Sequence, residues 1–523
     1  MKTNLLDIKP ESLFSKELAA DNETKNYTRQ VEKACFSWVE TLKPSSPELI
    51  HYSKVLLDEL DLVIEDKDEF LQVMSGAKKF NDFKAFTMCY GGHQFGHWAG
   101  QLGDGRAINI AELTIKEKPL TLQLKGSGPT PYSRRADGLA VLRSSIREYL
   151  CSEAMHHLGV PTTRALSLVK TGDWVPRDML YDGNQEDEHG AVVCRVAESF
   201  IRIGSFEIFA ARKDHDTLKQ LTDFTIKQHF KHLGEPSKAV YLGFFQEVVD
   251  RTRDLMIEWQ RVGFVHGVMN TDNLSILGLT IDYGPYGWLE DYNEGWTPNT
   301  TDAQNKRYRF GNQSQIALWN LVRLANALYP LIEEAEPMQE ILSSYQKSYK
   351  VKYHEMMCAK LGLQAFDNVP QEFIKGLTNN LQSTSVDMTL FYREISSVQL
   401  HSFEDLWAIV KETSYLSLDE ISERENSWSN WYRDYSLLLK QEGRELEERQ
   451  ATMKLVNPNY VLRNYMAQMA IDKANEGDYS LVNELYELLT KPYAEQEDMQ
   501  KWYAKRPDWA KHKVGCSMLS CSS

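Results

Sequence analysis

A short segment in the middle of the chain gathers side chains that suit metal binding and proton transfer. It reads HGVMNTDN from His266 to Asn273, and DYG follows from Asp282. The amide oxygen of Asn273 and the carboxylate of Asp282 are hard oxygen ligands, which suit magnesium or manganese held with waters and bridging phosphate oxygens. The carboxylate of Asp272 adjoins this pair. We therefore expect a reaction centre that acts on a phosphate-bearing substrate.

The spacing in this segment is that of a protein-kinase catalytic loop, with one departure. A kinase loop reads HRDxxxxN and precedes DFG. Here His266 and Asn273 keep the seven-residue separation and DYG stands for DFG, but Val268 occupies the place of the catalytic aspartate. A valine cannot accept a proton, so either the chain is inactive or another group is the base. Asp272 is the candidate, because a general base must lie within hydrogen-bond reach of the attacking hydroxyl.

Three features upstream follow the order of a kinase nucleotide-binding lobe. The run WAGQLGDGR contains Gly103, Gly105 and Arg106, and glycine lets backbone N–H groups approach phosphate while arginine adds bidentate charge. Lys125 ends the alternating strand LTLQLK, and Glu148 lies in the middle of a helix. Kinases use this order to hold a phosphate-binding lysine in position. Taken singly, the glycines also fit a plain hairpin and the lysine a solvated strand end.

Four further residues, three of them charged, extend the candidate site. The segment GSGPTPYSRRADG is too rich in glycine and arginine for a core element, so we expect a loop in which Asp137 and Gly138 contact phosphate. Arg195 and Arg202 flank the apolar run VAESFI. Seven residues apart, they would share a helix face but lie on opposite faces of an unbroken strand. The preceding run is strand-like, so a bend near Glu198 is needed to aim both at one ligand.

Four regions are expected to position these residues. Residues 1–80 read as a polar helical N-terminal extension, and 81–205 as a nucleotide-binding lobe with a strand at 120–125 and a helix at 141–158. Residues 206–440 read as a helical lobe carrying the catalytic loop, and 441–523 as a C-terminal helical region with a cysteine-containing tail. The predicted fold class is α+β: a divergent, two-lobed, protein-kinase-like fold with helical N-terminal and C-terminal extensions.

The composition of the chain limits the classes of partner and the cellular location that we expect. The 523 residues carry a formal charge of -15, which disfavours a nucleic acid, because basic patches drive such binding. No apolar run approaches the roughly 20 residues that span a bilayer, and the first twenty residues resemble neither a signal nor a transit peptide. Seven cysteines without a CxxC pair argue against a disulfide scaffold and a structural zinc site. We expect a cytoplasmic monomer without a membrane partner.

Most of the candidate site residues, though not Arg195 and Arg202, lie in segments by which the chain resembles the selenoprotein O family of atypical kinases. The segments span about residues 90 to 470 and read YGGHQFGHWAGQLGDGRA, LQLKGSGPTPYSRRADGLAVLRSSIREYLCSEAM, HGVMNTDNLSILGLTIDYGPYG and NPNYVLRNYMAQMAI. The resemblance implies protein AMPylation. ATP is bound in the reverse of the kinase orientation, a protein hydroxyl of Ser, Thr or Tyr attacks the α-phosphate, and pyrophosphate leaves. UMP transfer from UTP has also been attributed to relatives.

The resemblance also implies a role for each residue. Asp272 is the proton acceptor, and Asn273 and Asp282 hold Mg²⁺ or Mn²⁺. Lys125 is paired with Glu148. The residues that line the nucleotide are Gly103, Gly105, Arg106, Lys125, Asp137, Gly138, Arg195, Arg202 and Asp282. The resemblance thereby explains Arg195 and Arg202, because a reversed nucleotide needs cations deep in the pocket, where a kinase places adenine.

A redox role is implied for the tail. Cys521 stands where some family members carry selenocysteine, and some bacterial relatives pair this thiol with a cysteine in the segment after DYG. Here that segment reads DYNEGWTPNTTDAQ and contains no cysteine. Either the chain lacks the regulatory disulfide, or the bond involves Cys516 or a partner molecule.

Three functions remain open on the sequence. The first is a protein adenylyltransferase. The second is a metal-dependent protein kinase that moves the γ-phosphate, which follows from the kinase-like order of parts. The third is a non-catalytic, ATP-binding pseudokinase scaffold, which follows from Val268 at the usual base position.

Overall fold

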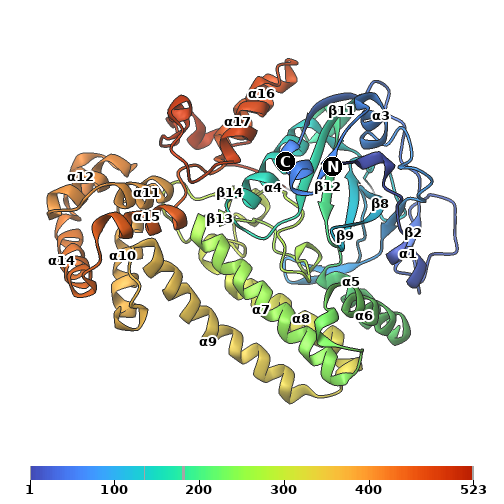
Figure 1. Ribbon diagram of the computed structural model, residues 1–523, viewed down its shortest axis with the longest axis horizontal. Helices are drawn as coiled ribbons and strands as arrows, with labels where there is room; N and C mark the ends of the chain where they lie inside the picture. Colours follow the sequence, from blue (N-terminus) through green and yellow to red (C-terminus); the bar gives the residue numbers. More distant parts are fainter. Residues whose placement is uncertain (1, 135, 180–182, 521–523) are drawn as a thin grey trace.

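A large antiparallel sheet occupies one side of the molecule, and long helices occupy the other (Figure 1). The structure is a computed structural model that describes residues 2–134, 136–179 and 183–520. The main sheet has eight strands in the order β2-β5-β8-β9-β12-β11-β3, with β10 paired to β12. The strands of the described chain are β1 Thr3–Asn4, β2 Phe36–Trp38, β3 Glu48–Tyr52, β4 Leu62–Val63, β5 Phe86–Met88, β6 Gly91–Gln94, β7 His97–Gln101, β8 Ala107–Ile115, β9 Lys118–Lys125, β10 Ala140–Val141, β11 Arg164–Asp178, β12 Gln185–Ala197, β13 Phe264–Val265 and β14 Gly287–Trp288.

Helices cover both faces of the sheet and form the rest of the molecule. Helices α7, α8 and α9 pack together below the sheet, α10 to α15 gather at the far end, and α16 and α17 contact α4 (Figure 1). The helices are α1 Leu13–Glu17, α2 Lys54–Glu59, α3 Lys67–Met74, α4 Leu142–His157, α5 Ile203–Ala211, α6 His215–His229, α7 Lys238–Val262, α8 Gln313–Ile332, α9 Ala335–Lys360, α10 Gln371–Ser383, α11 Met388–Ser397, α12 Phe403–Thr413, α13 Leu418–Ser422, α14 Glu425–Glu442, α15 Leu446–Val456, α16 Asn464–Asn475 and α17 Ser480–Leu489. None of the described helices is long and apolar enough to cross a membrane.

The two-residue period of the central strands decides which side chains reach the interior between sheet and helices. On β12, Val192, Cys194 and Val196 belong to the core that the sheet shares with the N-terminal helices α2 and α3. Val193 belongs to the opposite core, where α4 packs. Arg195 has the same parity as Val193, so it points toward α4 as well. The strand alternation therefore places the buried Arg195 side chain on the face toward α4, the helix that carries Glu148.

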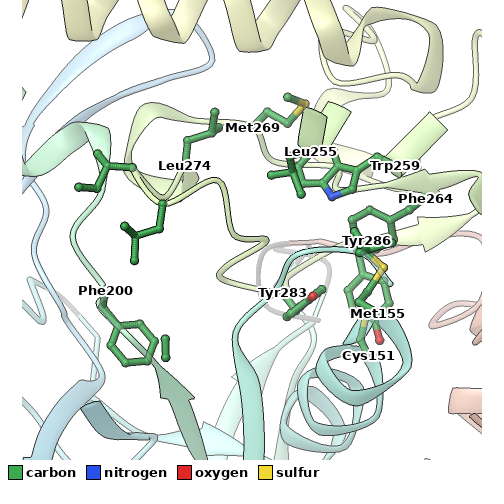
Figure 2. Packing of buried hydrophobic residues seen from close by; sticks show 14 of the residues in the cluster. Cys151, Met155, Phe200, Leu255, Trp259, Phe264, Met269, Leu274, Tyr283 and Tyr286 are labelled. Atoms are coloured by element: carbon green, nitrogen blue, oxygen red, sulfur yellow. The ribbon is translucent and has the colours of Figure 1, made fainter. Parts of the chain in front are cut away.

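An aromatic cluster holds the segment from Gly263 to Trp288 in place (Figure 2). Tyr286 stacks on Phe264 with ring centres 5.8 Å apart, and its hydroxyl donates to the backbone oxygen of Arg147 on α4 at 2.7 Å. Trp259, near the end of α7, donates its indole N–H to the Thr280 hydroxyl at 2.9 Å. Buried aromatic rings with satisfied polar tips give rigid packing, so this core fixes the loop that precedes Asp282.

The structure confirms several local predictions and corrects one. The strand expected at 120–125 lies within β9, the helix expected at 141–158 is α4, and the chain beyond Phe206 is mainly helical, as expected. The expectation that residues 1–80 are helical is wrong, because β2 and β3 are the two edge strands of the main sheet. Edge strands this short carry too little alternation to be recognised, and their pairing partners lie far away in sequence. The four-region division and the kinase-like topology stay predictions.

Candidate active site

A cavity of about 610 Å³ lies between β8, β9, the loop before β10 and the segment from Val268 to Pro285. It brings together most of the residues that the sequence singled out. Those that line it are Gly103, Gly105, Arg106, Lys125, Asp137, Gly138, Arg195, Asp272, Asn273 and Asp282. Glu148 and Arg202 lie behind the wall, each in contact with a lining residue.

A buried ion-pair chain runs along the back of the cavity. Lys125 Nζ lies 2.6 Å from Glu148 Oε2, and Arg195 Nη1 lies 3.2 Å from Glu148 Oε1. Glu148 on α4 therefore holds two cations that come from adjacent strands, β9 and β12. Burial lowers the pKa of Lys125 from its ordinary value, and Glu148 opposes that shift. Lys125 and Glu148 can both stay charged in this buried position because each lies against a group of opposite charge.

Asp282 is held between two arginines. Its Oδ1 accepts from Arg195 Nη1 at 2.5 Å, and its Oδ2 accepts from Arg202 Nη1. Burial alone would raise the pKa of Asp282, but Arg202, Arg195 and Lys125 outweigh burial and hold this pKa well below the ordinary value. The carboxylate is therefore ionised at neutral pH. The backbone of Asp282 has φ 56°, a left-handed conformation that aspartate tolerates better than most residues.

The two arginines converge because the chain bends between them. Strand β12 ends at Ala197 and helix α5 begins at Ile203, so the expected bend near Glu198 is present. Arg202 Nη1 also donates to the backbone oxygen of Asp272 at 2.8 Å, which ties the candidate base to the Asp282 cluster. Within the described chain, Arg195 Nε is buried without a hydrogen-bond partner, whereas Arg202 Nη2 lies 3.8 Å from Asp104 Oδ1. Arg195 lines the cavity, so its guanidinium suits the oxygens of a phosphate, and Arg202 contacts Asp282 and the backbone of Asp272 from behind the wall.

Asp272 is a nearly desolvated carboxylate, with 7% of the residue exposed. Gln94 Nε2 donates to its Oδ2 at 3.1 Å, whereas its Oδ1 is buried without a partner among the described residues. Burial raises the pKa of Asp272 to about 7, and the Gln94 hydrogen bond is the strongest opposing influence. A carboxyl group with this pKa can accept a proton near neutral pH and release it again.

In the loop before Asp272, His266 is buried and makes backbone contacts. Its Nε2 lies 2.9 Å from Ile281 O, and its Nδ1 lies 3.3 Å from Val268 N. Asn273 donates its amide nitrogen to Val268 O at 2.9 Å, so its amide oxygen is the end left for a metal ion. Val268 itself lines the cavity, where its side chain can accept no proton.

The glycines act by close packing rather than by presenting free amides, contrary to expectation. The N–H of Gly103 donates to Tyr90 O at 3.0 Å, and the N–H of Gly105 donates to Gly103 O at 2.9 Å. Gly103 has φ +70°, and a Cβ there would lie 2.3 Å from the ring of Tyr132. Gly138 has φ +75°, and a Cβ there would lie 2.3 Å from backbone atoms of Gly128 and Pro129. Both positions let the loop around Tyr132 close over one end of the cavity.

Several residues of this site escaped the sequence reasoning. Arg177 on β11 donates two hydrogen bonds of 2.6 and 2.9 Å to the Asp137 carboxylate. These bonds hold the loop before β10 against the sheet. Gln123 lies two residues before Lys125, and the strand alternation could have revealed it; its side chain accepts from Arg195. Gln94 contacts Asp272 across 178 residues, and no local pattern signals such a contact.

The cysteine predictions remain open. Cys516 is a buried free thiol whose pKa burial raises to about 11, so little thiolate forms at neutral pH. Cys521 lies outside the described residues. The described part of the chain also contains no group of three or more His, Cys, Asp and Glu side chains that could hold a metal.

Comparisons with known proteins agree with one another. The family model described as Protein adenylyltransferase SelO matches residues 19–490. A protein of Flavobacterium johnsoniae named Protein nucleotidyltransferase YdiU is 55% identical over 521 residues, which are 99% of this chain and 100% of that protein. A protein of the same name from Rhodopirellula baltica is 52% identical over 537 residues, covering 99% of each chain. Another, from Azoarcus sp. strain BH72, is 50% identical and covers 98% of each.

Proposed function

The chain belongs to the SelO family of protein adenylyltransferases, and we propose that it transfers AMP from ATP to Ser, Thr or Tyr hydroxyls of other proteins. The enzyme is a protein nucleotidyltransferase. UTP is the alternative donor. The observation that carries the proposal is the position of Asp272: it is a protonatable carboxyl in the same cavity as Asn273, the ionised Asp282 and Val268, the valine at the place of the kinase base.

The reaction assigns one task to each group. The acceptor hydroxyl attacks the α-phosphorus, its proton passes to Asp272, and the bond from the α-phosphorus to the bridging oxygen of the β-phosphate breaks. Pyrophosphate leaves with the electron pair of that bond. Lys125 and Arg195, which line the cavity, supply positive charge for the phosphate oxygens, and Arg202 acts through its ion pair with Asp282. Preorganised cations of this kind need no rearrangement as charge develops.

The oxygen donors suit magnesium or manganese. Asn273 has its amide nitrogen bonded to Val268 O, which orients the oxygen for a ligand, and Asp282 is ionised. Two protein ligands are enough for Mg²⁺, which completes its shell with substrate phosphates and waters. The bound ion would supply charge neutralisation at the phosphates. Because both oxygens of Asp282 accept from arginines, a bound metal would have to share this carboxylate with them.

The kinase-like arrangement is part of the proposal. Lys125 at the end of a strand pairs with Glu148 in the middle of a helix, and the catalytic segment follows on the far side of the cavity. This is the order in which kinases hold ATP. The cytoplasmic location and the monomeric state likewise stay proposals.

The decisive experiment follows the label of ATP. The purified protein is incubated with Mg²⁺ or Mn²⁺ and ATP labelled at either the α- or the γ-phosphate, and the mass of the modified protein is measured. We expect the α-label on protein, an adenylyl mass increase and released pyrophosphate. A stable γ-label with a phosphate mass increase would show a kinase instead. ATP binding without any adduct, on this chain or on added proteins, would show a pseudokinase.

A further inference from the structure

Two arginines beside the reaction centre flank one tryptophan, and within the described chain neither forms an ion pair with a carboxylate. The Cζ atoms of Arg307 and Arg323 lie 4.8 and 4.7 Å from the ring centre of Trp319 on α8. Among the described residues, neither guanidinium forms an ion pair, and the Nε atom of each is buried without a hydrogen-bond partner. The whole chain has a formal charge of -15. Buried carboxylates lie near both arginines, Asp302 near Arg307 and Glu207 near Arg323, but neither forms an ion pair with its guanidinium among the described residues, so both guanidiniums can take a further anionic partner.

A continuous set of contacts joins this pair to the candidate base. Gln94 on β6 donates to Asp272, and the next residue, Phe95, donates its backbone N–H to the Tyr308 hydroxyl at 2.9 Å. Tyr308 follows Arg307 directly in the chain. A Cβ on Gly96 would lie 3.5 Å from Arg307 Cζ, so the turn of the β6–β7 hairpin lies against that guanidinium. The hairpin therefore reaches from the reaction centre to the arginines.

The hairpin adds an exposed aromatic residue to the same region. Trp98 on β7 is 40% exposed. The ring of His93 lies 5.1 Å from Trp98 and 5.4 Å from Trp319, measured between ring centres, so His93 connects the hairpin to α8. Glu207 accepts from His93 Nδ1 at 2.6 Å. Tryptophan and arginine are the residue types most enriched among the energetically dominant residues of protein interfaces.

We propose that Trp98, Arg307, Trp319 and Arg323 form the docking surface for the acceptor protein, and that they bind an acidic segment next to its modified hydroxyl. The inference rests on the proposed function, because it takes Asp272 as the base. An acceptor whose hydroxyl reaches Asp272 past Gln94 has its neighbouring residues over the hairpin. Carboxylates in those residues meet the two unpaired guanidiniums, which favour bidentate contacts with carboxylates.

Three fluorescent peptides test the docking surface directly. Each carries one serine, one threonine and one tyrosine, and these are flanked by glutamates, by glutamines or by lysines. Binding to the full-length protein is measured by fluorescence anisotropy at low ionic strength. We expect the glutamate peptide to bind roughly tenfold more tightly than the glutamine peptide, as two charge contacts of a partly exposed kind would give. Raising the salt concentration should remove most of this difference.

Matched variants separate the surface from the general charge of the protein. The double variant R307Q/R323Q should lose the preference for the glutamate peptide, whereas R307K/R323K should keep part of it. The control K375Q/R433Q removes two cations that are 67% and 69% exposed on α10 and α14, and it should behave as the unmodified protein. Equilibrium dialysis of ATP and thermal unfolding verify that each variant still folds and binds the nucleotide.

Three results would overturn the docking proposal. The first is equal binding of the three peptides, and the second is an acidic preference that R307Q/R323Q leaves intact. The third is tighter binding of a single-stranded RNA probe than of the glutamate peptide, which would assign the arginines to nucleic acid instead. Transfer of label from α-labelled ATP to the bound peptide reports on the proposed function separately. A preference for the glutamate peptide with γ-label transfer would reject AMPylation but keep the docking surface.

Discussion

Replacing Asp272 by asparagine should abolish most nucleotide transfer and at the same time stabilise the folded protein at alkaline pH. The reason lies in the surroundings of the carboxylate. It is almost fully buried, it accepts one side-chain hydrogen bond, from Gln94, and its Oδ1 has no partner among the described residues. A negative charge in such a place opposes folding, because the unfolded chain hydrates it fully.

The size of the effect follows from the pKa of Asp272, which burial raises from 3.8 to about 7. The folded-state pKa is the higher one, so the natural protein loses stability as the pH rises from 3.8 to about 7, and the asparagine variant does not. The full difference corresponds to about 4 kcal/mol. Asparagine can keep the bond from Gln94, but its amide then points where Oδ1 lies and costs about 1–3 kcal/mol without a partner. The net gain is about 1–3 kcal/mol above pH 7.

Thermal unfolding at about pH 5 and about pH 8 measures this difference. Transfer of α-label should fall roughly 10²- to 10⁴-fold in the variant, the usual contribution of a positioned base, with ATP binding retained. Glu112→Gln is the matched control: Glu112 is also buried, with a pKa raised to about 7, but it lies on β8 outside the cavity. It should change stability in the same direction and leave transfer unchanged. An Asp272→Asn variant that is less stable at pH 8, or that labels protein at the natural rate, would refute the reasoning.

Three further predictions follow from the cavity. Glu148→Gln leaves Lys125 buried without its counter-charge, and should destabilise the protein by about 3–5 kcal/mol in denaturant unfolding and lower kcat/KM for ATP; unchanged values would remove the pair from the mechanism. Gly103→Ala should lower the melting temperature through its clash with Tyr132, whereas Gly100→Ala, which has a similar φ of +74° and open space, should cost less. Chelation of divalent ions should stop transfer without changing the melting temperature, and unfolding on chelation would instead show a structural metal.

A variant that lacks the Asp282 carboxylate is expected to lose stability as well as activity. Removing this carboxylate leaves Arg195 and Arg202 facing each other in a buried site, which is strongly unfavourable. Loss of activity in Asp282→Ala therefore combines loss of a metal ligand with loss of structure. Asp272→Asn avoids this problem, because no ion pair ends on that side chain.

Local sequence was sufficient for the parts of the site that lie within one element. The separation of His266 and Asn273, the strand that ends at Lys125 and the helix that carries Glu148 all follow from spacing and periodicity. These patterns survive because each depends on hydrogen bonds or side-chain directions within a few residues. The bend between Arg195 and Arg202 was also deducible, since strand parity required it.

Contacts between distant segments were not deducible. Nothing near Gln94 indicates that it contacts Asp272, nothing near Arg177 indicates that it holds Asp137, and the short edge strands β2 and β3 carry too little periodicity to be recognised. The sequence suggested that Gly103 brings a backbone amide to phosphate, whereas in the tertiary structure its N–H is bonded to Tyr90 O and the ring of Tyr132 leaves no room for a side chain.

The sequence by itself thus determined which residues could carry out the chemistry and which family the chain resembles, because residue type and local spacing are written along the chain. The tertiary structure alone decided the charge states. Asp272 and Asp282 have the same side chain and lie ten residues apart, yet burial raises the pKa of Asp272 while two arginines hold the pKa of Asp282 down. The difference arises because desolvation and Coulomb interactions depend on distance through space.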